Sequence, residues 1–244
     1  MRRTEFLNAI LKTIIMKEGR AYSGSSMHRT AVSARRVSPL DRLYENLTRN
    51  GSPEPVDLIF VIAGRMERKQ YGLDLYRAGF APRLLLSIGR FEVSKMPAID
   101  FGALDELIRL RNGTRPDERH FFCEINASGI QIEKVSLPRW STYGELLALR
   151  DRLECGQARS LIIVSTDVHL RRIAVSVERI FRGVPLKFVY CPVPERYCFL
   201  RKEKWWIRRT DRWFVIKEAI KLLGYRVILS LPDWAVQRCM RLSG

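Results

Sequence analysis

From residue 56 onward, short apolar runs alternate with segments whose apolar residues recur at helical spacing. Nearly continuous apolar runs are typical of strands buried on both faces of a parallel sheet. The predicted strands cover residues 56–63, 83–88, 120–126, 130–137, 161–164 and 186–191. The predicted helices cover residues 71–78 (closed by Gly79), 101–110, 142–153, 168–181 and 211–223, the last ending at Gly224. This order predicts an α/β fold with a Rossmann-like, mostly parallel sheet, helices on both faces and additional terminal helices, and a hairpin around Ser128 and Gly129.

Three regions are expected along the chain. Residues 1–55 are read as a basic N-terminal helix, amphipathic over about the first 16 residues, followed by a loosely ordered segment with a weak helical signal near residues 40–47. The N-terminal helix has two readings: packing on the domain, which is favoured, or lying on a membrane surface. Residues 56–195 form the α/β domain, and residues 196–244 form a basic, aromatic helical segment packed on it.

Charge is the unusual feature of the composition. The chain has 43 Lys and Arg against 26 Asp and Glu, a net charge of +17. Such a surplus attracts anionic partners: phosphorylated small molecules, acidic membrane surfaces or nucleic acid. The five cysteines form no CxxC pair and only three histidines are present, so we expect no disulfide framework and no metal site. No stretch approaches the roughly 20 apolar residues of a membrane span, which predicts a cytoplasmic protein, with peripheral association with the inner membrane as the alternative.

Polar residues follow the predicted strands where a ligand is expected. In open α/β sheets, ligands bind beyond the carboxyl ends of the strands. The candidate anion-binding residues there are Gly64, Arg65, Arg68, Ser87, Gly89, Thr142, Glu145, Ser165, Thr166 and Arg172. Arg68 and Arg172 would clamp the anion, with the backbone amides near Gly64, Gly89 and Thr142 around it. His169 is the candidate catalytic residue, as an acid–base group or a nucleophile.

Each of these residues also has a purely structural reading. Thr142 and Glu145 fit a helix capping box, and Ser165, Thr166 or Asp167 would serve as a helix cap. The glycines would only make tight turns. The arginines after the first strand would be solvated surface charges, and His169 would be a structural histidine. The sequence leaves both readings open.

The ordered motifs resemble those of the YdcF/SanA/ElyC family, whose pattern is "LY..G.AP", "SGG", "NT..E" and "TS..H..R". The chain reads RKQYGLDLYRAGFAP at residues 68–82, SIG at 87–89, STYGE at 141–145 and STDVHLRR at 165–172. It departs from the pattern at Ile88, Ser141 and Leu146, which points to a different or weaker ligand. The resemblance covers about residues 56–192. It implies a Rossmann-like fold, and it brings two associations: S-adenosylmethionine binding for one member, and cell-envelope or lipid-carrier metabolism for others.

Three functions are therefore weighed. The leading one is binding of a phosphorylated or nucleotide-like small molecule, linked to cell-envelope or polysaccharide metabolism, with hydrolase or transferase chemistry as an extension. The second is S-adenosylmethionine binding. The third is a basic membrane-surface or nucleic-acid module, built from Trp205, Trp206, Trp213 and Phe214 among cationic residues. The alternative for this segment is that Trp206, Trp213 and Phe214 pack a terminal helix; nucleic acid is disfavoured because no recognition motif is present.

Overall fold

A computed structural model describes residues 38–99, 102–137, 141–154, 158–198 and 200–242. The chain divides into residues 1–36 and a compact unit of residues 37–244, and every described residue lies in the second. The amphipathic helix predicted near the N-terminus lies outside the described residues.

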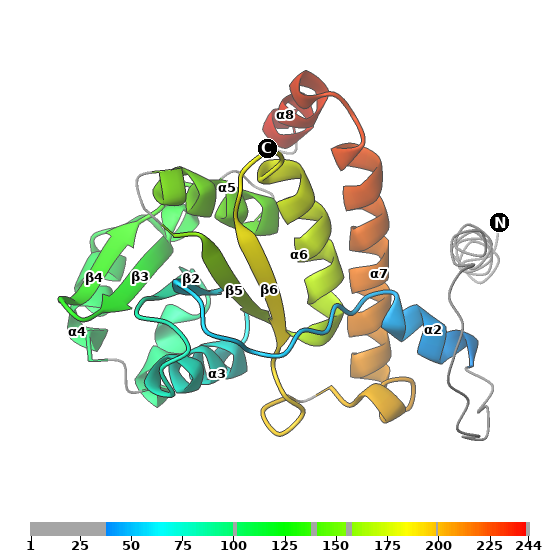
Figure 1. Ribbon diagram of the computed structural model, residues 1–244, viewed down its shortest axis with the longest axis horizontal. Coiled ribbons are helices and arrows are strands. Elements are labelled where there is room, and N and C mark those ends of the chain that lie inside the picture. Colours follow the sequence, from blue (N-terminus) through cyan, green and yellow to red (C-terminus); the bar gives the residue numbers. More distant parts are fainter. Residues whose placement is uncertain (1–37, 100–101, 138–140, 155–157, 199, 243–244) are drawn as a thin grey trace. The chain divides into compact units, whose positions relative to one another are not determined.

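One mixed sheet forms the centre of the compact unit (Figure 1). Its strands are β1 (Leu58–Val61), β2 (Leu84–Gly89), β3 (His120–Asn126), β4 (Gly129–Lys134), β5 (Ser160–Ser165) and β6 (Lys187–Pro192). The strand order is β4-β3-β2-β1-β5-β6. The β2–β1, β1–β5 and β5–β6 pairs are parallel, whereas the β2–β3 and β3–β4 pairs are antiparallel. In the β3–β4 pair, Asn126 lies opposite Gly129. The α/β class, the mostly parallel sheet and the predicted hairpin are confirmed.

Helices cover both faces of the sheet (Figure 1). They are α2 (Pro39–Glu45), α3 (Met66–Arg77), α4 (Leu104–Asn112), α5 (Ser141–Glu154), α6 (Asp167–Ile180), α7 (Arg209–Leu229) and α8 (Asp233–Leu242), with short 3₁₀ turns that include η1 (Val93–Ala98). Helix α3 ends two residues before Gly79, whose φ of +80° belongs to the left-handed region that a helix terminus favours.

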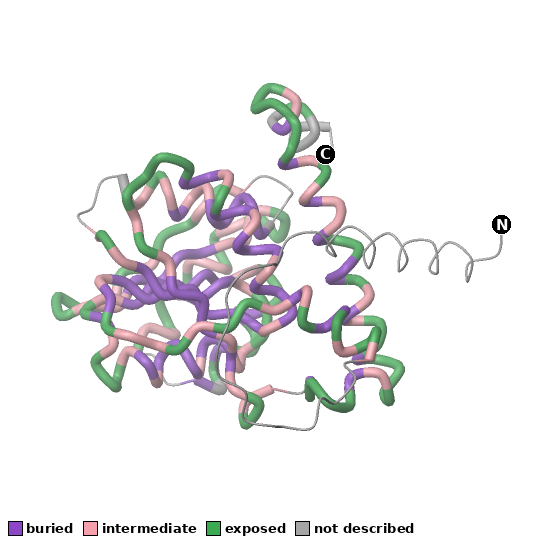
Figure 2. Tube along the Cα trace, turned by 45° about the vertical axis from the view of Figure 1, so that its right-hand side comes forward, coloured by how far each residue is buried: buried purple, intermediate pink, exposed green. Residues whose placement is uncertain are grey.

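Successive residues of a strand point to opposite faces, so β1 serves two separate cores. Ile59 and Val61 pack in one core with residues of α3, η1 and α4. Leu58 and Phe60 pack in the other with residues of α5, α6 and α7. Figure 2 shows the buried strands running between these two helical layers. This double burial explains why the strands are nearly continuous apolar runs.

Two segments differ from the sequence expectation. Residues 38–55 were expected to be loosely ordered; the weak helical signal near residues 40–47 corresponds to α2, but Leu43 and Tyr44 of this helix are buried. Helix α7 does not end before Gly224 but continues to Leu229. That prediction was wrong because Tyr225 and Leu229 continue the buried face of the helix. Their burial outweighs the cost of one helical glycine, about 1 kcal/mol.

The C-terminal aromatic residues divide between packing and exposure. Trp205 is buried and its ring lies 6.3 Å from that of Tyr44, centroid to centroid. Trp213, one of the three aromatics expected to pack, is 41% exposed on α7. Among the described residues, no helix combines the length and the apolar character that crossing a bilayer requires.

Candidate functional site

The strand order places a topological switch point between β1 and β5. The chain leaves β1 toward α3 and β2 on one side, and leaves β5 toward α6 and β6 on the other. Loops diverge at such a point and open a site for ligands. Arg68 spans it: its Nη1 donates to the carbonyl of Ala63 after β1 at 2.6 Å, and its Nη2 donates to Thr166 Oγ1 after β5 at 3.0 Å.

Gly64 forms the outer side of this position. Its φ of +141° is rarely adopted by other residues, and a Cβ built there would lie 2.6 Å from Nη1 of Arg68. Gly64 is exposed, whereas Arg68 is only 5% exposed. The Arg68 guanidinium therefore lies directly beneath an accessible glycine, and only glycine allows this close approach.

Arg68 is the incompletely paired cation of the site. Burial lowers its pKa, although the charges of Glu92 and Glu145 offset part of this effect. Its Nη1 and Nη2 donate to a carbonyl and a hydroxyl, not to a carboxylate. Its Nε is buried without a hydrogen-bond acceptor among the residues that the structure describes. A buried guanidinium in this state is costly without an anion, and a ligand anion would relieve the cost.

His169 lies in the first turn of α6 beside two hydroxyls. Its Nδ1 is 2.9 Å from Ser165 Oγ, and its Nε2 is 3.4 Å from Thr142 Oγ1. Burial, followed by the charges of Arg172 and Arg68, lowers its pKa well below 6.5. The imidazole is therefore neutral at pH 7, able to accept a proton at one nitrogen and to donate one from the other.

Arg172 joins this cluster to the C-terminal helix. Its Nη1 donates to Thr142 Oγ1 at 2.8 Å, and its Nη2 lies 2.9 Å from Glu218 Oε2 on α7. Its guanidinium also stacks over the ring of Tyr225 at 5.1 Å. Burial alone would raise the pKa of Glu218, but Arg172 and Lys221 outweigh it and lower that pKa. Arg172 is thus a fully paired cation.

A second buried ion pair lies at the tips of β1 and β2. Lys69 Nζ is 2.8 Å from Glu92 Oε1, and Glu92 Oε2 accepts from the backbone amide of Gly89 at 2.7 Å. The amide of Gly64 also donates to Glu92. The two glycine amides that the sequence assigned to a ligand are therefore held by the protein's own carboxylate. The reason is that Glu92, just before η1, folds back over the strand ends.

Glu145 is a buried acceptor rather than part of a capping box. Its Oε2 accepts from the amide of Ala63 at 2.9 Å and from Ser87 Oγ at 2.8 Å. Burial raises its pKa. Ser87 Oγ also lies 2.7 Å from Nε2 of His120, whose pKa burial lowers to about 4. Glu145 thus links the ends of β1 and β2, and the capping reading of residues 142 and 145 is wrong.

Most of the residues predicted for the site meet at one sheet edge. Those that share contacts there are Gly64, Arg68, Ser87, Gly89, Thr142, Glu145, Ser165, Thr166, His169 and Arg172. Arg65 is the exception: it is exposed, and its Nη1 is 3.6 Å from Glu67. It is a surface charge, as its structural reading predicted.

Four buried or half-buried members of the cluster escaped the sequence analysis: Lys69, Glu92, His120 and Glu218. The sequence contained a signal for Glu92, because this residue follows Gly89 by three positions at the end of a predicted strand. Glu218 was not, because 46 residues separate it from Arg172. Within the described ranges, no three His, Cys, Asp or Glu side chains gather as a metal centre would require.

Comparison with family models, with curated proteins and with solved structures found no match to this chain.

Proposed function

We propose that this chain binds a phosphorylated or nucleotide-like small molecule at the switch point between β1 and β5. The observation that carries the proposal is Arg68, a buried guanidinium without a carboxylate hydrogen bond, beneath exposed Gly64. Arg68 would accept the anion, since guanidinium groups pair with phosphate oxygens in a bidentate manner.

The neighbouring strand ends limit which groups would hold the ligand. The amides of Gly64 and Gly89 already donate to one carboxylate, that of Glu92. Because these donors are satisfied within the protein, the anion would be held by the Arg68 guanidinium and not by the glycine amides. Thr142 would contribute a hydroxyl beside His169, and Arg172, whose charge is paired with Glu218, would hold that hydroxyl in place.

A chemical step, if the ligand is turned over, falls to His169. A neutral imidazole would take a proton from a water that attacks the terminal phosphorus, or attack that phosphorus itself. In either case the bond to the bridging oxygen breaks and the remaining phosphate leaves, and in the second case water then hydrolyses the phosphohistidine. The motifs that resemble the YdcF/SanA/ElyC family support placing this binding in cell-envelope or polysaccharide metabolism. S-adenosylmethionine is less well supported. The acidic residue after β2, Glu92, uses its carboxylate on Lys69 and the glycine amides instead of a ribose.

The test is calorimetric titration of the full chain with inorganic pyrophosphate, ADP and S-adenosylmethionine. We expect one site for pyrophosphate or ADP, and at least an approximately tenfold weaker affinity in Arg68→Met. Arg109→Met, an equal charge change on an exposed position of α4, is the control and should bind normally. Equal affinity in all three proteins would contradict the proposal.

The role of His169 is tested separately by phosphate release from ADP. If turnover occurs, His169→Asn should abolish release while retaining binding, because the amide preserves hydrogen bonding but transfers no proton at neutral pH. Full turnover in His169→Asn would leave His169 as a positioning residue only.

A further inference from the structure

Helix α7 has an apolar face that stays partly exposed in the described chain. Its inner face is buried through Asp211, Val215, Glu218, Leu222, Tyr225 and Leu229. On the opposite face, Trp213, Ile220 and Val227 recur every seven residues and are 41%, 50% and 64% exposed. Partly exposed Ile216 and Leu223 lie between them at helical spacing. We call these five residues the α7 stripe.

The charged residues that flank the stripe are all cationic, and one of them, Lys221, also pairs with Glu218. Lys217 and Lys221 follow one border, and Arg212 and Arg226 follow the other, as the 3.6-residue repeat places them. The two acidic residues of α7 are both buried on its inner face. A second copy of the chain would set like charges against each other along both borders, which is unfavourable. The complementary partner is therefore anionic.

The exposed indoles favour a lipid surface over a protein partner. Trp213 lies near the start of α7, and Trp234, 70% exposed, lies at the start of α8 beyond its other end (Figure 1). Trp residues combine a large apolar ring with a polar N–H and prefer the membrane–water boundary. An apolar stripe with cationic borders is the pattern of helices that lie in this boundary.

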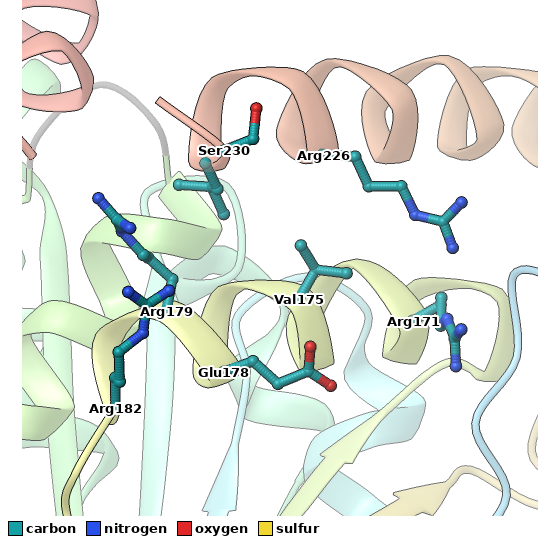
Figure 3. Close-up of a pocket in the computed structure, with 8 residues that line it drawn as sticks. Arg171, Val175, Glu178, Arg179, Arg182, Arg226 and Ser230 are labelled. Atoms are coloured by element: carbon teal, nitrogen blue, oxygen red, sulfur yellow. The ribbon is translucent and has the colours of Figure 1, made fainter. Parts of the chain in front are cut away.

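A groove of about 360 Å³ opens between α6 and α7 and carries a matching charge (Figure 3). Four arginines line it: Arg171 and Arg179 from α6, Arg182 from the turn after α6, and Arg226 from α7. Arg179 also pairs with Asp233 at the start of α8. Glu178 is the one acidic lining residue, and it pairs with Arg49 at 3.4 Å. Arg226 thus belongs to both features, as a border of the stripe and as a wall of the groove.

We propose that the α7 stripe lies on an anionic lipid surface, with the arginines of the groove binding lipid phosphate groups. This interaction uses different residues from the ligand site at the sheet edge and does not depend on it. It makes the protein peripheral: the stripe enters the headgroup region, and the rest of the domain stays outside the bilayer.

Cosedimentation of the full chain with vesicles tests the proposal. We expect binding to phosphatidylcholine vesicles that contain about one third phosphatidylglycerol, and none to phosphatidylcholine alone, at about 0.1 M salt. Ile220→Ser with Val227→Ser should weaken binding at least about tenfold without changing net charge. Val184→Ser, at a position 44% exposed in the turn after α6, is the matched control and should bind as the wild type does.

A second arm examines the groove and the source of the phosphate. Arg171→Gln with Arg182→Gln should weaken vesicle binding severalfold more than Arg109→Gln with Arg111→Gln on α4, a change of equal charge. About 10 mM inorganic phosphate should leave the protein on the vesicles, since one small anion replaces neither the stripe nor several headgroups. Release by phosphate at constant ionic strength would assign the groove to a soluble anion and overturn its role in lipid binding.

Three results would overturn the proposal as a whole. The first is an equal effect of Val184→Ser and of the stripe double substitution on vesicle binding, which would show that net charge and not the α7 stripe binds the vesicles. The second is a dimer in light scattering that the double substitution dissociates. The third is a complex with a soluble acidic helical peptide that forms more tightly than the vesicle complex and is lost with the same substitution.

Discussion

Replacing Arg68 and Arg172 separately by methionine distinguishes an arginine that binds a ligand from an arginine that stabilises the fold. Both guanidinium groups are buried, at 5% and 6% exposure. Arg172 is paired with Glu218 at 2.9 Å, whereas Arg68 hydrogen-bonds only a carbonyl and a hydroxyl and leaves its Nε without an acceptor. We therefore expect Arg172→Met to lower the stability of the fold, and Arg68→Met to weaken ligand binding with little change in stability.

Arg172→Met leaves the Glu218 carboxylate buried with Lys221 as its remaining ion-pair partner. Removing one partner of a buried pair costs about 3–5 kcal/mol, and the Lys221 contact places the expected loss near the lower end. For a domain of this size each kcal/mol corresponds to about 2–4 °C, so the unfolding temperature should fall by roughly 6–12 °C. Arg68→Met removes two hydrogen bonds but also a desolvated charge, so the free energy of unfolding should change by less than about 1 kcal/mol.

Differential scanning calorimetry on the ligand-free proteins measures both effects, with Arg109→Met as the exposed control. With pyrophosphate at about 100 times the wild-type dissociation constant, the wild type should gain about 2.7 kcal/mol, and Arg68→Met, with an at least tenfold weaker affinity, should gain about 1.4 kcal/mol or less. A loss of stability in Arg68→Met as large as that in Arg172→Met would refute the reasoning, because it would make Arg68 a structural residue.

Three further predictions follow from the same contacts. Gly64→Ala should lose about 1–3 kcal/mol of unfolding free energy and weaken anion binding, because the φ of residue 64 is +141° and the new Cβ would meet Arg68. Gly224→Ala should gain about 0.5–1 kcal/mol, because Gly224 lies inside α7 and a Cβ there would meet nothing within 4 Å. Urea unfolding of both variants measures the two changes. Because burial lowers the pKa of His120 from 6.5 to about 4, the unfolded state takes up its proton first as the pH falls. The wild type should then lose about 3 kcal/mol of stability between pH 6.5 and 4, and a His120→Gln protein with the same pH slope would contradict this. Lys69→Met should lower the unfolding free energy by about 3–5 kcal/mol, because it leaves the buried Glu92 carboxylate without its cation. Thermal unfolding should show that the double variant, Lys69→Met with Glu92→Gln, recovers part of that loss. A double variant that is no more stable than Lys69→Met would show that the two residues are not coupled.

The architecture could be predicted from the sequence because burial on both faces makes strands nearly continuous apolar runs. β3 was predicted with the bounds that the structure has, and the hairpin at Gly129 was located correctly. The extent of α7 was not predictable from the local glycine signal, because tertiary burial of Tyr225 and Leu229 decides it.

The site divides in the same way. The carboxyl ends of parallel strands must converge, so polar residues just after each strand, such as Arg68 and Thr166, could be placed together from the sequence. Their partners could not, because Glu218 comes from a terminal helix whose packing no local pattern records. The use of Glu92 as an internal anion on the glycine amides was likewise hidden, since it depends on how η1 folds back.

The most direct test of the central claim is a crystal structure of the full chain grown with pyrophosphate. We predict electron density for the anion at the β1–β5 switch point, within hydrogen-bond distance of Arg68 and next to Gly64. Density for the anion only among the arginines between α6 and α7, with Arg68 still bonded to Ala63 and Thr166 alone, would contradict it.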